Sequence, residues 1–285
     1  MPVLAMRIFG DRSSLLDFDA YQAGVPELAW IVEDRVLQEA LWRDLHVPVL
    51  RGPCHELRLG AKLVIGADGA NSFVRTSAGI AAREKSYGQI AVVANFRCER
   101  PHENVAYQWF QRGAVLALLP LPDNHVSMVW STAVAPGDDL APEVERASGG
   151  VLGKLTLVTP PRSYPLRRLA AERMVAPRIA LAGDAAHVIH PLAGQGLNLG
   201  LQDARALARV LSAREPSRDP GELGLLRRYE RARAEPILAM DMMVDTLFRL
   251  FGAESDFVAA LRNGGLNLTD RLPVVKNMLV RQAIH

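Results

Sequence analysis

The segment from residue 178 to 200, RIALAGDAAHVIHPLAGQGLNLG, restricts the possible folds of this chain more than any other segment. It begins with residues 178–182, which are apolar after the first residue, as in a strand buried within an α/β sheet. Gly183 and Asp184 follow directly, and Gly194 precedes apolar residues at helical spacing. Because open α/β sheets bind ligands at the carboxyl ends of their strands, this order predicts a ligand site there.

The residue types in this segment indicate what the ligand is. The Asp184 carboxylate can accept hydrogen bonds from sugar or ribityl hydroxyl groups. Glycines at 194 and 196 allow a flat ligand to approach the backbone, and a helix start offers unpaired N–H groups and partial positive charge. Such a helix end would stabilise the negative charge of a reduced isoalloxazine ring. The alternative is a capped helix in any α/β protein, but the complete segment favours a flavin.

A second segment, 64–75 (VIGADGANSFVR), has a related pattern. A short apolar strand, within the predicted strand 62–67, ends just before Asp68, and its continuous apolarity predicts burial on both faces. Gly69 permits a tight turn beside a phosphate-bearing ligand. Arg75 could supply positive charge to that ligand. The alternative is a strand end with an Asx turn. If both strands lie in one sheet, Asp68 and Asp184 should reach the same ligand-facing edge.

The rest of the chain predicts one α/β region and one β-rich region. Apolar spacing predicts an amphipathic helix over residues 34–45 and another beginning at Gly194, with Leu197, Leu201 and Leu211 on its apolar face. Further helices are expected at 142–152, 223–233, 237–251 and 272–284. Strands are expected at 3–9, 90–97, 105–110, 115–119, 126–131 and 163–166.

Together the two segments resemble the DG and GD motifs of the FAD-dependent aromatic hydroxylases, the group of para-hydroxybenzoate hydroxylase. Residues 31–41, 109–131 and 261–281 are similar to segments of the hydroxylases of ubiquinone biosynthesis. The resemblance implies an α/β fold: a Rossmann-like FAD/NAD(P)-binding domain, here incomplete, with an inserted antiparallel β-sheet substrate domain and C-terminal helices. The implied segments are 1–81 (partial FAD-binding domain), 82–165 (substrate sheet), 166–213 (FAD-binding domain) and 214–285 (helical region).

The resemblance also implies a chemistry and a set of cofactor-binding residues. FAD is reduced by NAD(P)H, and oxygen from O2 is then delivered to the aromatic ring of a polyprenylated ubiquinone precursor. The flavin carries this chemistry, so no catalytic side chain is expected. Asp184, after Gly183, would hold the ribityl chain, and Arg35, Asp68 and Gly69 would lie near the diphosphate, with Asp68 also available to the nicotinamide cofactor. The residues expected beside the isoalloxazine are Pro191, Gly194, Gln195, Gly196, Leu197 and Asn198.

The sequence departs from this family in ways that affect the prediction. It contains no GxGxxG loop, which binds the adenosine diphosphate part of FAD in the family's first βαβ unit. The interval between Arg35 and Asp68 is also short, and Ala114 follows Gly113 where the family favours proline. We therefore expect an N-terminally truncated member. A non-catalytic remnant or an accessory subunit that binds no FAD is the alternative, and a halogenase or reductase is a third possibility.

Composition and the remaining polar residues narrow the partners. The chain has 33 Lys+Arg against 31 Asp+Glu, which gives no reason to expect a nucleic-acid partner. Cys54 and Cys98 lack metal-site spacing and suggest a reducing compartment, although a disulfide between them is left open. His187 and His190 have no evident third metal ligand, so we expect packing or structural hydrogen bonds rather than a metal site.

The expected location is cytoplasmic, with peripheral association with the inner membrane or with a biosynthetic complex left open. The first residues do not resemble a signal peptide, and no apolar run is long enough to span a membrane. Residues 237–251 are apolar and rich in methionine, which suits a core-packing helix or docking on a membrane or lipophilic tail.

Overall fold

The computed structural model describes residues 1–10, 14–50, 52, 60–111, 113–137, 139–191 and 194–252, the side chains of 247 and 249–252 excepted. Chain contacts divide it into two compact units. The first contains residues 1–48 and 89–165, and the second contains residues 49–88 and 166–248. This division differs from the four segments expected from the sequence, because residues 1–48 group with the β-rich region and residues 214–248 with the α/β region.

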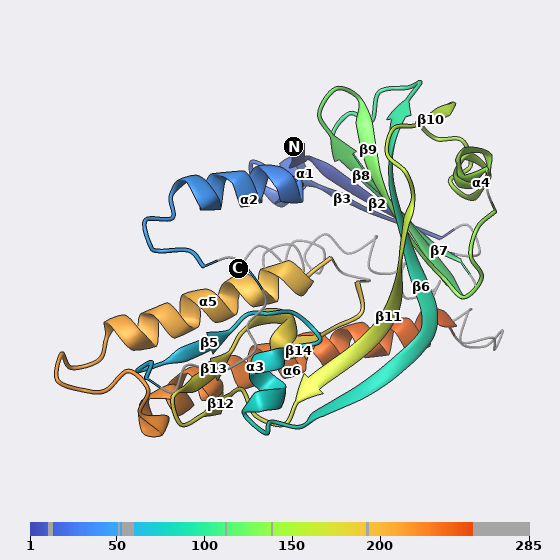
Figure 1. The fold of residues 1–285 in the computed structure, drawn as a ribbon. Helices are drawn as coiled ribbons and strands as arrows, with labels where there is room; N and C mark the ends of the chain where they lie inside the picture. The colour runs from blue at the N-terminus through green and yellow to red at the C-terminus, as the bar shows by residue number, and fades with distance from the viewer. Residues whose placement is uncertain are drawn as a thin grey trace. The chain divides into compact units, whose positions relative to one another are not determined.

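The first unit is built on a sheet whose strands follow the order β6-β9-β8-β7-β2-β3 (Figure 1). All neighbours are antiparallel except β2 and β7, which are parallel, and β10 pairs with β6. The strands are β2 (Ala5–Phe9), β3 (Leu15–Asp19), β6 (Ala82–Cys98), β7 (Val105–Gln111), β8 (Ala114–Leu121), β9 (His125–Thr132) and β10 (Leu155–Leu157).

The core of the first unit lies on one face of this sheet. Alternate residues of β6 (Val92, Ala94 and Phe96) pack with Leu140 and Val144 of helix α4 (Leu140–Ala147), because successive strand residues point to opposite faces. The unit is completed by β1 (Pro2–Val3) paired with β4 (Ala29–Trp30), and by helices α1 (Ala20–Ala23) and α2 (Asp34–Arg43). The predicted β-rich region and the helix beginning at Asp34 are therefore confirmed.

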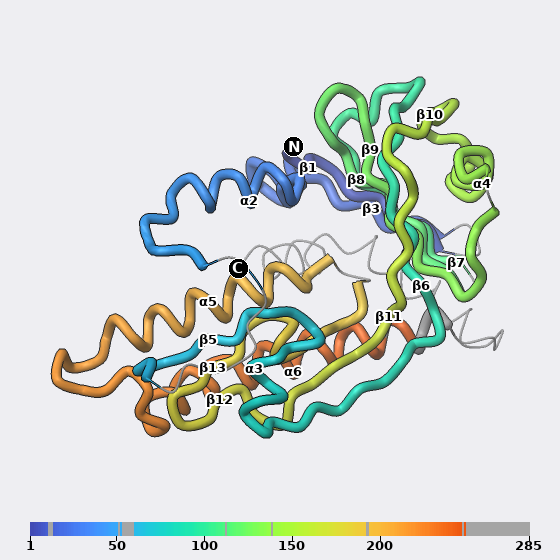
Figure 2. Tube along the Cα trace, in the orientation of Figure 1, coloured from blue at the N-terminus to red at the C-terminus, as the bar shows by residue number. Residues whose placement is uncertain are grey.

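The second unit has a small sheet of three strands in the order β12-β13-β5 (Figure 2). Strand β12 is antiparallel to β13, whereas β13 and β5 are parallel. A core of Val74, Leu181, Leu207, Leu226 and Tyr229 joins this sheet to its helices. The elements are β5 (Val64–Gly66), α3 (Phe73–Ser77), β12 (Val175–Ala176), β13 (Ile179–Leu181), η1 (Gly183–Ala185), β14 (His187–Val188), α5 (Gly196–Ser212) and α6 (Leu223–Gly252).

Two long strands connect the units along the chain. Strand β6 begins in the second unit and continues into the first, and β11 (Arg162–Ala171) runs from the first into the second, where it pairs with β14. The sequence predicted only short strands at both places. The first residues of β6, from Arg83 to Ser86, are exposed and charged or polar, so they lack the apolar pattern by which a strand is predicted.

Three other expectations were wrong. The two helices predicted at 223–233 and 237–251 form the single helix α6, with Pro236 inside it. On α5 the predicted apolar residues Leu197 and Leu201 are 58% and 47% exposed, whereas the buried residues include Leu199 and Leu207. Strand β5 is not buried on both faces, because Ile65 is 49% exposed and β5 is the last strand of its sheet among the described residues. The predicted helix at 272–284 lies outside the described residues.

Candidate functional site

The two sequence motifs meet at one edge of the small sheet. Strands β5 and β13 run parallel, with Gly66 opposite Leu181, so their carboxyl ends lie side by side. The Ala182 amide donates to the Gly66 carbonyl at 2.9 Å, which extends the pairing beyond the strands. Asp68 follows β5 by two residues and Asp184 follows β13 by three. The structure therefore confirms that both aspartates emerge at the same edge.

The loop after β5 is organised by the Asp68 carboxylate. It accepts hydrogen bonds from the Ser72 hydroxyl at 2.5 Å and from the Val74 amide at 3.1 Å. Ser72 in turn caps helix α3 by accepting from the Arg75 amide at 2.9 Å. Partial burial opposes ionisation of Asp68, but these hydrogen bonds outweigh it and lower the pKa of the carboxyl. The Asp68 side chain therefore organises its own loop, through bonds from residues four and six positions further along the chain.

Arg75 does not present its charge to a ligand, contrary to the sequence expectation. Its side chain is buried, and its guanidinium donates to the Ala185 carbonyl at 2.8 Å and to the Ala70 carbonyl at 2.9 Å. One carbonyl belongs to each motif. The buried cation therefore fastens the turn after β13 to the loop after β5.

Two glycines shape the turn after β13: Gly183 within it and Gly200 on helix α5 beside it. Gly183 has a φ of +61°, in the left-handed region that favours glycine. A Cβ on Gly200 of α5 would lie 3.3 Å from the Gly183 Cα, so the helix backbone passes close to the turn. The side chain of Asp184, which leaves this turn, is exposed and has no hydrogen bond or ion pair to any residue that the structure describes.

The beginning of α5 is open to a ligand. The residue that precedes the helix, Gln195, makes no side-chain hydrogen bond to the first-turn amides and instead accepts from Asn198 Nδ2 at 2.8 Å. The Gly194 amide donates to the Pro191 carbonyl at 2.9 Å. A Cβ at Gly194 or Gly196 would meet no atom within 4 Å, and the same holds at Gly69 in the other motif. The glycine backbone of both motifs therefore faces open space.

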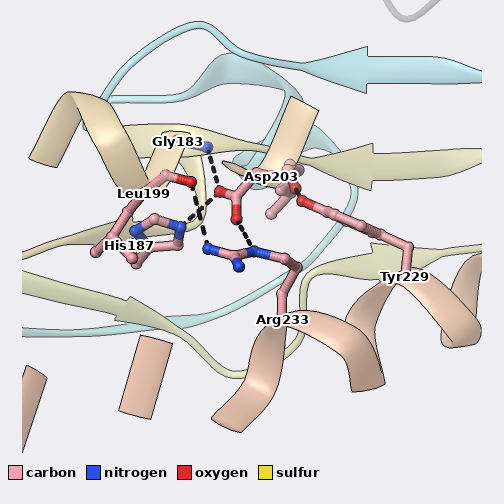
Figure 3. A network of polar contacts seen from close by, with 7 residues as sticks. Gly183, His187, Leu199, Asp203, Tyr229 and Arg233 are labelled. Carbon is pink, nitrogen blue, oxygen red and sulfur yellow. Dashed lines mark hydrogen bonds and ion pairs between the residues drawn. The ribbon is translucent and has the colours of Figure 1, made fainter. Parts of the chain in front are cut away.

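Behind the turn lies a buried polar network that the sequence did not predict (Figure 3). Asp203 of α5 is fully buried and accepts hydrogen bonds from the Gly183 amide at 2.9 Å, His187 Nε2 at 2.6 Å and Arg233 Nε at 2.6 Å. Burial opposes ionisation of Asp203, but the bonds from His187, Arg233 and Gly183 lower its pKa. Tyr229 donates to the Leu181 carbonyl at 2.7 Å beside this network.

The two histidines have structural contacts. His187 bonds to Asp203, which confirms the expected structural hydrogen bond. His190 is buried between Tyr87 and Phe248, with ring centroids 4.7 Å and 5.0 Å away, and burial lowers its pKa to about 4. Neither histidine belongs to a group of three metal-ligating side chains in the described part of the chain. Their roles are therefore in packing and hydrogen bonding.

Arg35 is the one predicted site residue that lies in the first unit. Its side chain is 86% exposed, and its Nε lies 2.8 Å from Glu39 Oε1, one turn further along α2. Helix α2 has no buried residue. The structure therefore gives Arg35 a local partner and leaves its predicted place near the diphosphate as a prediction.

Other features of the sequence bear less directly on the site. Burial raises the pKa of the Cys98 thiol to about 11, and Cys54 lies outside the described residues, as does the segment 261–281. Within the described ranges, no helix combines the length and apolar character needed to cross a membrane.

Comparison with known proteins gives consistent matches. The FAD binding domain family matches residues 49–242. Ubiquinone hydroxylase UbiL of Rhodospirillum rubrum is 36% identical over 312 residues, covering 99% of this chain and 73% of the relative. The 3-demethoxyubiquinol 3-hydroxylase of Escherichia coli is 36% identical, covering 94% of this chain and 75% of the relative.

Solved structures show the same fold. Klebsiella pneumoniae HpxO in complex with FAD and uric acid has a TM-score of 0.70 at 17% identity, covering 98% of this chain and 80% of that one. The p-nitrophenol 4-monooxygenase PnpA of Pseudomonas putida has a TM-score of 0.75 at 17% identity, covering 99% of this chain and 80% of that one. At these identities the likeness establishes the fold alone.

Proposed function

The chain belongs to the FAD-dependent aromatic hydroxylases related to the enzymes of ubiquinone biosynthesis, and we propose that it hydroxylates an aromatic ring of a ubiquinone precursor, using NAD(P)H and O2. Family membership makes it an FAD-dependent oxidoreductase. The names of two relatives, a ubiquinone hydroxylase and a 3-demethoxyubiquinol 3-hydroxylase, support the finer proposal of a phenol or quinone precursor as substrate.

One observation carries this proposal. Parallel strands β5 and β13 bring two motif loops to one edge, where an uncapped helix start and three glycines face open space. A flat ring can approach the backbone at Gly194 and Gly196 because no atom of the described residues lies within 4 Å of a Cβ built at either position. The Asp184 carboxylate, exposed and without a described partner, remains available for hydroxyl groups. The residues present therefore fit a flavin with a ribityl chain.

We assign the cofactor-binding roles as follows. Asp184 accepts hydrogen bonds from the ribityl hydroxyl groups, and Gly183 allows the turn that presents it. The first amides of α5 stabilise negative charge on the reduced ring, since a helix N-terminus carries about half a positive charge. Pro191, Gly194, Gln195, Gly196, Leu197 and Asn198 line the ring, while Arg35, Asp68 and Gly69 serve the diphosphate.

The chemistry then divides between cofactor and chain. FAD, when bound, accepts hydride from NAD(P)H and activates O2. The residues of this chain bind and orient the ring. Asp68 contributes mainly by holding the loop around Gly69, because its carboxylate is already occupied by Ser72 and Val74.

A direct test uses the purified full chain. We expect it to take up FAD and to show flavin absorbance after removal of free cofactor. With an isoprenoid-substituted phenol, it should then consume NAD(P)H and O2 and release a product one oxygen atom heavier. Uptake of FAD without substrate-dependent hydroxylation would restrict the proposal to flavin binding. Hydroxylation in the absence of flavin would overturn it.

A second candidate is a non-catalytic remnant or accessory subunit that binds no FAD. One observation favours it: among the described residues strand β5 has an unpaired edge with Ile65 exposed. A titration of the colourless protein with FAD discriminates the two. The remnant predicts no change in flavin fluorescence at micromolar protein.

Peripheral membrane association remains part of the proposal for partners. Helix α6 exposes Leu238, Met242 and Met243 at 57%, 60% and 46%, whereas Val244 is 1% exposed. Exposed apolar residues on one helix suit a lipid surface or a partner in a biosynthetic complex. Co-sedimentation with liposomes should decrease when Leu238 and Met242 are replaced by serine, and full recovery of the wild-type chain in the supernatant would contradict this.

A further inference from the structure

We propose that Asp203 is a positioning residue for the flavin: it fixes the Gly183–Asp184 turn in its binding geometry before the cofactor arrives. This inference rests on the proposed flavin site and adds a residue that does not touch the cofactor. The carboxylate lies behind the turn, and its three partners come from three different elements (Figure 3).

The charge of Asp203 is buried. Asp203 is 0% exposed, and a buried carboxylate is costly unless several donors satisfy it. The donors are the Gly183 amide of η1, the His187 ring of β14 and the Arg233 guanidinium of α6. Arg233 also reaches the Leu199 carbonyl of α5 at 3.4 Å. A hydrophobic residue of similar size would pack between these helices without the desolvation cost of a buried charge. We therefore infer that the carboxylate serves to fix its hydrogen-bond donors in place.

The Asp203 carboxylate acts directly on the turn. Its bond to the Gly183 amide fixes the Ala182–Gly183 peptide, at the entrance to the turn and one peptide before that of Asp184, the residue with the available carboxylate. On the opposite side of the turn, the backbone of Gly200 packs closely against Gly183. Arg75 donates a hydrogen bond to the Ala185 carbonyl. The turn is therefore held on three sides, and only the Asp184 side chain is left unengaged. This arrangement predicts a turn that does not reorganise when a ligand binds.

The decisive comparison is between two aspartate-to-asparagine variants. Asp203→Asn keeps the size of the side chain but replaces one acceptor with an amide group that faces a donor. Asp241→Asn is the matched control, because Asp241 also lies on a helix and pairs with an arginine, Arg168 Nε at 2.8 Å, and has no hydrogen bond to the turn residues 183–185 that the structure describes. Asp203→Asn removes the charged partner of Arg233 and His187, and Asp241→Asn removes the charged partner of Arg168, all within the second unit.

We expect Asp203→Asn to raise the dissociation constant for FAD by about tenfold or more relative to Asp241→Asn, which corresponds to about 1.4 kcal/mol. Binding is measured by flavin fluorescence at a temperature where circular dichroism shows both variants to be folded. Equal affinities of the two variants would overturn the positioning role while leaving the flavin site intact. Failure of the wild-type chain to bind FAD would overturn both proposals.

A measurement on the wild-type chain covers the case in which Asp203→Asn does not fold. Hydrogen–deuterium exchange of peptides containing Gly183 should be slow in the FAD-free protein, because the amide already donates to a buried carboxylate. Addition of FAD should change this exchange little. Rapid exchange that becomes slow only with FAD would show that the cofactor, rather than Asp203, organises the turn.

Discussion

Helices α5 and α2 have similar amphipathic sequences, yet they differ in how much of their apolar face is buried. Helix α5 buries Leu199, Asp203 and Leu207 within the second unit, whereas α2 has no buried residue and exposes Val36 and Trp42 by 54% and 56%. Helical periodicity therefore predicts that a face can be buried but does not say whether a neighbour covers it. Both helices carry predicted cofactor residues. Of the two, only α5 has a buried polar network of described residues beside it, the one centred on Asp203.

The largest expected difference between these helices comes from Asp203. Asp203→Ala leaves Arg233 buried without its carboxylate, so we expect the free energy of unfolding to fall by about 3–5 kcal/mol. Arg35→Ala on α2, which removes an exposed side chain paired with Glu39, should leave it unchanged. Urea denaturation of the two variants measures both values. Similar losses would mean that α2 is as firmly packed as α5.

The aromatic cluster around His190 should give the second unit an acid sensitivity that exposed α2 lacks. The pKa of His190 is about 4 in the folded chain and about 6.5 when unfolded, so the unfolded state binds more protons between these values. Stability should fall as the pH drops from about 6.5 to about 4, by up to about 3 kcal/mol. His190→Phe should flatten this part of the pH profile in urea denaturation. An unchanged slope would assign the sensitivity to other groups.

The two glycines of α5 have different surroundings: Gly200 packs against the turn, whereas Gly196 faces open space. Gly200→Ala places a Cβ 3.3 Å from the Gly183 Cα and should cost about 1–3 kcal/mol of stability. Gly196→Ala places its Cβ in open space and should change stability by less than about 1 kcal/mol. Thermal unfolding distinguishes the two. A larger loss from Gly196→Ala would mean that the helix start is already covered.

The smallest expected effect concerns α2 itself. Because Trp42 is 56% exposed, Trp42→Ala should change the free energy of unfolding by no more than about 0.5 kcal/mol. Denaturation of this variant tests directly whether α2 is less covered than α5. A cost above about 2 kcal/mol would show that the apolar side of α2 is covered in solution.

Those parts of the site that depend on short-range sequence patterns could be predicted from the sequence. The parallel strands, their aspartates and the glycine-rich helix start follow from short-range patterns, and the structure has all of them. Asp203 was missed because a pattern of apolar residues counts aspartate as solvent-facing, although it lies four residues from both Leu199 and Leu207. Only the tertiary fold brings Arg233 and His187 to it.

The helix boundaries show the same limit. Pro236 removes an amide donor, which predicts a break, yet α6 continues through it. Burial of Leu225, Leu226 and Tyr229 before the proline and of Val244 after it offsets the local cost. Such compensation depends on contacts made by distant segments and cannot be obtained from local propensity.

The Arg75–Ala185 hydrogen bond joins residues 110 positions apart. At bacterial or eukaryotic translation speeds of about 5–20 residues per second, roughly 5–20 s pass between synthesis of the two partners. During that interval Arg75 has only its local acceptor, the Ala70 carbonyl, and lacks the Ala185 carbonyl that ties the two motifs together. The edge where the two motifs meet is thus completed late in biosynthesis, and a chain that ends before the GD turn would lack the Arg75–Ala185 bond.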